Sequence, residues 1–235
     1  MKFAKSFFAP IILAISTSVS AQVIYPPGYV NMNVQSGGLV VPINNYLSKN
    51  EEQGEDYITG RWNPGSIVLL SGDTIQNYPL KYNLLTRNVE VKTKQMVKVV
   101  PIGDVQQFYW LDNGQRLTFI NGSGYTVGST PMVGYYQVLG EGSLNLFKKY
   151  HLTVQKANYR PELDVGSTEN RLIKTVKYFV ATGKAIRELK NTKKIYDHFK
   201  QHRSTVKKFA KNERLNPKRE EDLIRIVQYY NEVAN

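Results

Sequence analysis

The three histidines are the first residues to consider as metal ligands. His198 and His202 lie four residues apart in a segment with helical periodicity, a spacing that places two imidazoles on one helical face. Phe199 stands where a zinc-protease helix needs glutamate, and the neighbouring lysines oppose a cation. We therefore expect solvated surface histidines and no metal site. His151 belongs to an expected strand, where its neighbours place it on the outward face.

Nucleophiles and paired carboxylates are equally weak candidates. Ser66 and Ser143 each follow a glycine at the start of an expected strand, not on the strand-to-helix turn that exposes a nucleophile. The chain has no cysteine, and the glycine-rich loop 122–128 is not followed by the Lys-Ser/Thr of a phosphate-binding loop. Four carboxylates fall at turns, where backbone geometry explains them: Asp73, Asp104, Asp112 and Glu141. We predict no catalytic residue, no cofactor and no enzyme.

A basic segment near the C-terminus is the one constellation with binding potential. Residues 184–219 contain 13 Lys or Arg against 3 acidic residues, whereas the whole chain has a formal net charge of +12. Such a surface favours polyanions, which include nucleic acid, anionic lipid headgroups and acidic protein faces. The alternative is an ordinary solvated helical face. The candidate contact residues are Lys193, Lys194, Lys200, Arg203, Lys207, Lys208, Lys211 and Arg214.

Tyrosine is unusually common, with 16 tyrosines against 9 phenylalanines. Exposed tyrosines favour carbohydrate or protein contacts, because they offer rigid amphipathic area. Half-buried strand positions explain the same residues equally well. Five of them fall in expected strands: Tyr78, Tyr82, Tyr109, Tyr135 and Tyr136.

The N-terminus has the pattern of a cleavable signal peptide. Lys2 and Lys5 precede an apolar stretch over 7–15, and the small residues up to Ala21 form a cleavage site. We expect export to the periplasm or the periplasmic face of the outer membrane, with passage beyond it left open. No cysteine is present to carry a lipid anchor, and no later apolar run reaches the ~20 residues of a transmembrane helix.

The remaining chain divides into three parts that must position these residues. Residues 22–62 form an extended leader rich in Pro, Gly and Asn, with a short strand expected at 39–41. Residues 63–190 alternate apolar and polar residues between turn signals, which predicts an antiparallel β domain of about ten strands. Residues 191–235 change to helical spacing and predict three short helices. The expected class is α+β: an antiparallel sheet, sandwich or partly closed barrel followed by a three-helix C-terminal unit.

The chain resembles a group of exported Gram-negative bacterial proteins of unassigned function. The resemblance depends on the 65–73 segment (GSIVLLSGD), on Tyr82-Asn83 and Phe108, on the 135–142 segment (YYQVLGEG), and on the terminal helix from Glu221 to Asn231. These motifs correspond to turns, strand starts and helix packing. The resemblance implies a β unit with C-terminal helices in a cell-envelope setting, and it implies no catalytic residues.

Together these features favour a non-enzymatic envelope protein that acts through protein–protein interaction. Its partner is expected to be another envelope protein. With that partner the chain could form an accessory subunit of an outer-membrane-associated assembly. A periplasmic carrier of an apolar or glycan ligand within the β domain is the alternative, and binding of anionic lipid or another polyanion by the basic helices is the third. The oligomeric state stays open.

Overall fold

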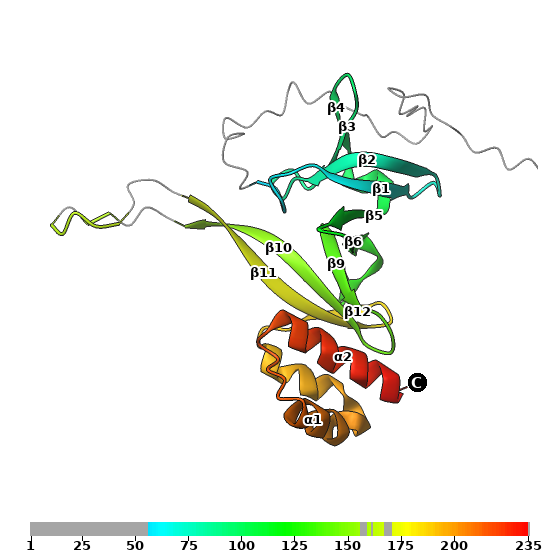
Figure 1. The fold of residues 1–235 in the computed structure, drawn as a ribbon, viewed down its shortest axis with the longest axis vertical. Helices are drawn as coiled ribbons and strands as arrows, with labels where there is room; N and C mark the ends of the chain where they lie inside the picture. Colours follow the sequence, from blue (N-terminus) through cyan, green and yellow to red (C-terminus); the bar gives the residue numbers. More distant parts are fainter. Residues whose placement is uncertain (1–55, 156–158, 161, 167–170, 235) are drawn as a thin grey trace, which may run out of the picture.

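The computed structural model describes residues 56–155, 159–160, 162–166 and 171–234. Twelve strands and two α-helices, with short 3-10 helices between them, make up this part of the chain (Figure 1). The strands are β1 (Asn63–Leu69), β2 (Thr74–Tyr82), β3 (Val89–Lys92), β4 (Val97–Val100), β5 (Val105–Asp112), β6 (Gln115–Asn121), β7 (Thr126–Val127), β8 (Thr130–Pro131), β9 (Tyr135–Gly140), β10 (Asn145–Gln155), β11 (Arg171–Thr182) and β12 (Ala185–Glu188).

All twelve strands belong to one sheet, in the order β4-β3-β2-β1-β5-β6-β9-β10-β11-β12-β7-β8. Almost every neighbouring pair is antiparallel and most are consecutive in sequence, so the expected meander is present. The pairing of β12 with β7 is parallel and joins the last two strands to the sheet. The sheet does not close, and the expected α+β class is confirmed.

Local sequence explains the hairpins. Between β5 and β6 the two turn residues Asn113 and Gly114 both have positive φ, 51° and 81°. This is the turn whose twist matches that of the flanking strands. It sets the pairing of Asp112 with Gln115, and that register carries Phe108 opposite Phe119.

The first core lies inside the curved half of the sheet formed by β1 to β6. Its centre is aromatic: Phe108 stacks on Phe119 with ring centroids 4.8 Å apart, and Trp110 lies 4.7 Å from Phe119. Tyr82 and Tyr135 meet edge to face at 5.2 Å in the same core. These rings lie in the interior of this half of the sheet.

The second core joins the other half of the sheet to the C-terminal helices. These are η4 (Thr192–His198), η5 (Lys200–His202), α1 (Arg203–Asn212) and α2 (Glu220–Ala234). The apolar side of α2 packs Leu223, Ile226 and Val227 against the sheet residues Leu144 and Leu146. Short helices next to the sheet near the C-terminus agree with the sequence, although two details differ.

The first detail is the type of the first helix, η4, which is a 3-10 helix and not an α-helix. Its cap is Asn191, whose side chain accepts a hydrogen bond from the Lys193 amide at 3.0 Å. The second is the start of the next α-helix, α1, which has no break in front of it. The chain passes from η5 directly into α1 at Arg203, so Ser204 lies within the first turn.

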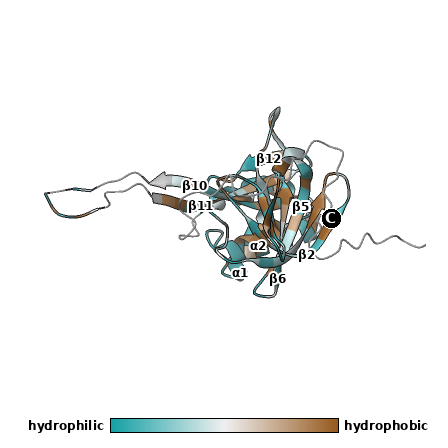
Figure 2. Ribbon diagram, turned by 90° about the horizontal axis from the view of Figure 1, so that it is seen from above, coloured by the Kyte–Doolittle hydropathy of each residue, from teal (hydrophilic) through white to brown (hydrophobic). Residues whose placement is uncertain are grey.

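A long hairpin of β10 and β11 extends away from the body (Figure 1, Figure 2). The two strands pair over eleven positions, from Asn145 with Ala181 to Gln155 with Arg171. Only the base of the hairpin pairs with further described strands: β9 pairs with β10 up to Lys148, and β12 pairs with β11 from Phe179 onward. Most of the hairpin therefore has two outer edges unpaired by any described strand.

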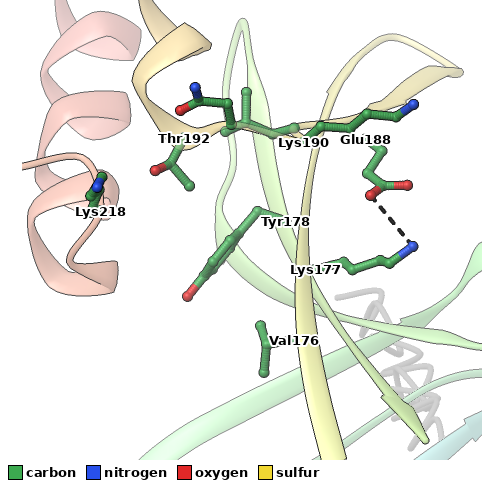
Figure 3. Close-up of a pocket in the computed structure, with 9 residues that line it drawn as sticks. Val176, Lys177, Tyr178, Glu188, Lys190, Thr192 and Lys218 are labelled. Atoms are coloured by element: carbon green, nitrogen blue, oxygen red, sulfur yellow. Dashed lines mark ion pairs between the residues drawn. The ribbon is translucent and has the colours of Figure 1, made fainter. Parts of the chain in front are cut away.

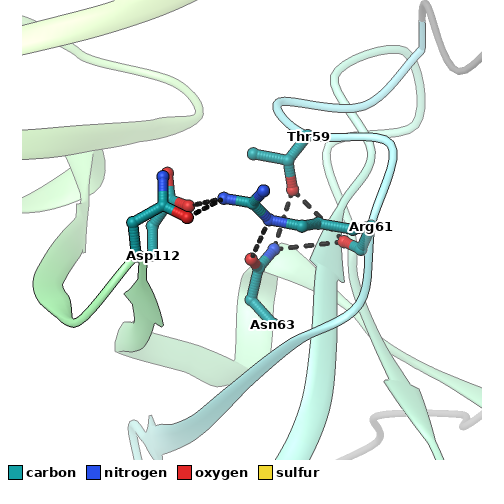
Figure 4. A network of polar contacts seen from close by, with 5 residues as sticks. Thr59, Arg61, Asn63 and Asp112 are labelled. Carbon is teal, nitrogen blue, oxygen red and sulfur yellow. Dashed lines mark hydrogen bonds and ion pairs between the residues drawn. The ribbon is translucent and has the colours of Figure 1, made fainter.

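The leader enters the fold before its expected end at residue 62. The signal peptide, the strand expected at 39–41 and the rest of 22–55 lie outside the described residues. Tyr57 forms a bridge with Asn83, and Arg61 pairs with Asp112 at the β5–β6 turn (Figure 4). Asn63 donates to the Thr59 hydroxyl at 2.7 Å and to the Arg61 carbonyl at 3.1 Å. These contacts attach residues 56–62 to the β domain.

Candidate interaction site on the C-terminal helical unit

The eight candidate contact residues share one property, which is that all of their side chains are exposed. They are distributed over successive segments: Lys193 and Lys194 in η4, Lys200 in η5, Arg203, Lys207, Lys208 and Lys211 in α1, and Arg214 just after it. We call these eight residues the cationic surface. Figure 2 shows α1 as mainly hydrophilic.

The opposite side of the same segments holds them in place. Val206 and Ala210 of α1 are buried, and Ile195 and Phe199 are fully buried. Phe209 stacks on Tyr229 of α2, with ring centroids 3.9 Å apart. Because the apolar residues supply the packing, the cationic surface is not needed to hold the helices together.

Few anionic groups neutralise the cationic surface. Arg203 pairs with Asp197 at 2.9 Å, with both side chains about half exposed. Lys207 lies 5.6 Å from the centre of the Tyr196 ring. In the described part of the chain no other residue of the cationic surface has an ion pair. The surface thus keeps a strong positive potential available to an anionic partner.

A groove lies beside the cationic surface, where the chain leaves β12 and turns into η4. Its volume is about 430 Å³. Figure 3 shows Tyr178 and Thr192 in its middle, Lys218 to one side, and Lys190 with the Lys177–Glu188 pair to the other. The lining residues are Val176, Lys177, Tyr178, Glu188, Leu189, Lys190, Asn191, Thr192 and Lys218.

Glu220, in the first turn of α2, attaches the helix to the sheet beside this groove. Its carboxylate accepts hydrogen bonds from Tyr178 Oη at 2.8 Å and from Lys148 Nζ at 3.0 Å. Burial raises the pKa of Tyr178, and the bond to Glu220 raises it further. Burial acts to lower the pKa of Lys148, but the contacts of its ammonium with Glu220 and Tyr150 together outweigh this and the pKa is raised. Tyr178 therefore stays neutral and Lys148 charged at physiological pH.

Sequence reasoning did not find this three-residue contact. The first-turn position of Glu220 also places its carboxylate favourably against the dipole of α2. The partners Lys148 and Tyr178 lie on neighbouring strands, and they face each other only because β10 and β11 pair in the register that sets Lys148 opposite Tyr178. The alternation of β10, which places Leu146 and Lys148 on one face, was the available signal.

The histidines are placed differently from expectation. His198 and His202 lie in separate 3-10 segments, so no continuous helix aligns them, and both are half-buried. Burial lowers the pKa of His198. The outward placement of His151 was wrong: its Nε2 is buried without a hydrogen-bond partner among the described residues. Within that same part of the chain, no group of three or more His, Asp or Glu side chains is arranged to hold a metal ion.

The turn carboxylates have structural contacts. Ser71 Oγ donates to Asp73 at 2.9 Å, and Asp112 pairs with Arg61. Of the tyrosines, Tyr82, Tyr135 and Tyr136 are buried in the β domain, whereas Tyr78 and Tyr109 are half-buried. Burial raises the pKa of Tyr82 to about 12. Core packing accounts for these three residues.

Comparison with protein-family models, with curated proteins and with solved structures finds no match to this chain. No described helix combines the length and apolar character needed to span a membrane. The site must therefore be interpreted from its own geometry.

Proposed function

We propose that this protein is an exported, non-enzymatic envelope protein that binds an acidic protein partner through the cationic surface. It would act in the periplasm or at the periplasmic face of the outer membrane, as an accessory subunit of an outer-membrane-associated assembly. The observation that supports this most directly is the separation of apolar and cationic side chains within the helical unit. Its apolar residues are buried and its eight cations are all exposed.

The layout of the cations favours a protein face over chemistry at a single point. The eight residues are spread over about three helical segments and do not converge on one cavity. A surface of this kind raises the rate of association with an oppositely charged partner and aligns it before close contact. Long, exposed lysines also lose side-chain entropy when fixed, so each contact is weak and the set acts together.

The experiment is recovery of partners from solubilised cell envelopes at increasing salt concentration. Wild-type protein is compared with the double variant Lys208→Gln/Lys211→Gln, which removes two charges from α1. The matched control is Lys94→Gln/Lys184→Gln, which removes two exposed charges from turns of the β domain. We expect the α1 variant to lose most of its partner and the control to retain it.

The salt dependence of partner recovery is a second result of the same experiment. Because exposed charges are screened over ~10 Å at 0.1 M salt, recovery should fall steeply between low salt and several tenths molar. Equal recovery of both double variants would overturn the proposal, and so would isolation of the wild type as a lone monomer at low salt. Capture by anionic vesicles with no protein partner would favour the lipid-binding alternative instead.

A further inference from the structure

The outer edge of β11 borders the groove described above, and part of its backbone is directed there. The Leu189 amide donates to the Tyr178 carbonyl at 2.8 Å, so Tyr178 directs its backbone groups to the outer edge. In a strand these directions alternate, so the amide and carbonyl of Val176 point the same way. β12 pairs with this edge only from Phe179 onward, and no other described strand pairs with it. The groove therefore contains a length of strand edge to which another extended chain can bind.

Cations lie on both sides of β11 in this groove. Figure 3 shows Lys218 on the side of Tyr178, and Lys177 and Lys190 on the other side. All three lysines are exposed. Because successive side chains of a strand point to opposite faces, a strand added at this edge would direct its side chains alternately toward Lys218 and toward Lys190.

The carboxylates near the groove already have partners. Glu188 pairs with Lys177 at 3.4 Å, and Glu220 beside the groove binds two groups of the sheet. Lys190 and Lys218 have no ion pair within the part of the chain that the structure describes. Each side of the edge thus presents an ammonium group that complements a carboxylate of a bound chain.

We propose that an extended acidic segment of the partner protein adds as a strand to the outer edge of β11 in this groove. Its backbone pairs with Val176, and the carboxylates of two successive residues reach Lys190 and Lys218. A helix or a lipid headgroup has no row of free backbone donors and acceptors to offer this edge, whereas an extended segment has one.

The inference rests on the proposed function, because it specifies how part of the acidic partner is bound. The groove and the cationic surface adjoin along the chain, since Lys193 follows Lys190 by three residues. One acidic partner can therefore contact the cationic surface and extend a strand into the groove.

Titration with a defined peptide, followed by NMR-detected hydrogen exchange, tests the inference on protein that contains residues 22–235. The probe is the capped peptide Thr-Val-Glu-Glu-Val-Thr, whose two glutamates face opposite sides of a strand. At a concentration that occupies about nine-tenths of the protein, exchange of the Val176 amide should slow about tenfold, because only the unoccupied fraction exchanges freely. No slowing at millimolar peptide would overturn the inference.

A second peptide separates strand pairing from charge attraction. N-methylation of both glutamates keeps the two charges but removes backbone donors and prevents regular pairing. We expect this peptide to leave the exchange of the Val176 amide unchanged. Equal slowing by the two peptides would show that the probe does not bind as a strand and would contradict the inference.

Charge substitutions test the two lysines. The variant Lys190→Gln/Lys218→Gln should bind the unmodified peptide about fivefold more weakly, because each exposed ion pair contributes only modestly. The matched control Lys92→Gln/Lys94→Gln removes two exposed charges from the end of β3 and the turn after it, and should retain wild-type affinity. Equal affinities of the two variants would exclude the assigned carboxylate contacts.

Failure of this inference can be distinguished from failure of the proposed function. If partner recovery depends on Lys208 and Lys211 but the peptide does not protect Val176, the strand site is wrong and the proposed function stands. If the peptide protects Val176 but partner recovery does not depend on the charges of α1, the strand site stands and the proposed function is wrong.

Discussion

Lys149 is a half-buried cation of the β domain. Its ammonium donates to the Tyr136 hydroxyl at 3.0 Å and to the Val133 carbonyl, and lies 4.6 Å from the centre of the Tyr136 ring. Burial, with the nearby charges of Arg87 and Lys177, lowers its pKa to about 8. The hydrogen bonds of Lys149 link β10 to β9 and to the segment before it. Its positive charge is disfavoured by burial and does not contribute to this link.

A pH prediction follows from this lowered pKa. Between about pH 8 and the ordinary lysine pKa of ~10.4 the unfolded chain binds a proton that the folded chain has released. The contribution of Lys149 to stability therefore rises with pH in this window, and its burial penalty is fully present below pH 8. Thermal melts of wild type and Lys149→Met should show the difference in melting temperature shifting in favour of wild type from pH 8 to pH 10. A difference that is constant over this range would contradict the prediction.

At the scale of elements, one side chain connects α2 to the turn between β9 and β10. Asn231 accepts a hydrogen bond from the Leu144 amide at 2.9 Å, and its amide nitrogen donates to the carbonyls of Leu144 and Glu141 at 3.0 and 3.2 Å. Gly142 is required beside it, because a Cβ there would lie 2.6 Å from Asn231 Cγ. The helix is thus fixed to the sheet by polar contacts as well as by its apolar face.

Asn231→Asp tests this connection. The variant replaces the donor amide with an oxygen that faces two carbonyls, so a buried repulsion replaces two hydrogen bonds. We expect a loss of ~1–3 kcal/mol in the free energy of unfolding, measured by urea denaturation. Gln228→Glu is the matched control, since it introduces the same charge on an exposed position of α2 and should change stability by less than ~0.5 kcal/mol. Equal effects of the two substitutions would show that the Asn231 contacts are not stabilising.

Local patterns predicted the elements well but not how they meet. The alternation of Phe108 and Trp110 is typical of a strand, and the Asn113-Gly114 pair is typical of the tight turn after it, as the structure has them. His151 and Lys149 were harder, because alternation shows only that they share a face and not that the fold covers it. The contact of Glu220 with Tyr178 joins residues 42 positions apart, and short-range periodicity contains no information on such a pairing. The exposure of the cationic surface was predictable because lysine and arginine side chains are almost always exposed to solvent.

At the scale of the whole molecule, two large hydrophobic cores pack against different parts of the sheet. The aromatic core is enclosed by β1 to β6, whereas the helical core covers β9 to β11. A third, smaller cluster, with Phe147 and Phe179, lies on the opposite side of the second half of the sheet. Beyond Tyr150 the described side chains of the β10–β11 hairpin are half-buried or exposed, so its outer part adds little to any core.

Shortening the hairpin should therefore leave the fold intact. We expect a variant in which an Asn-Gly turn replaces residues 153–173 to keep the melting temperature within a few degrees of wild type, because the described side chains among the deleted residues are half-buried or exposed. Differential scanning calorimetry measures this, and the pair of Leu152 with Lys174 is retained to preserve the contact with Ile58. A large drop in melting temperature would show that the hairpin contributes to a core.

The same hairpin has a mechanical consequence. Its eleven residue pairs follow one another without a shift of register, so it forms a continuous twisted ribbon whose base is fixed between β9, β12 and α2. Lys148 and Tyr178 at this base bond to Glu220, so the ribbon is joined directly to the start of α2. Tyr229 of α2 stacks on Phe209 of α1, and α1 carries Arg203, Lys207, Lys208 and Lys211 of the cationic surface. These contacts are the path by which a displacement of the hairpin would reach the helical unit.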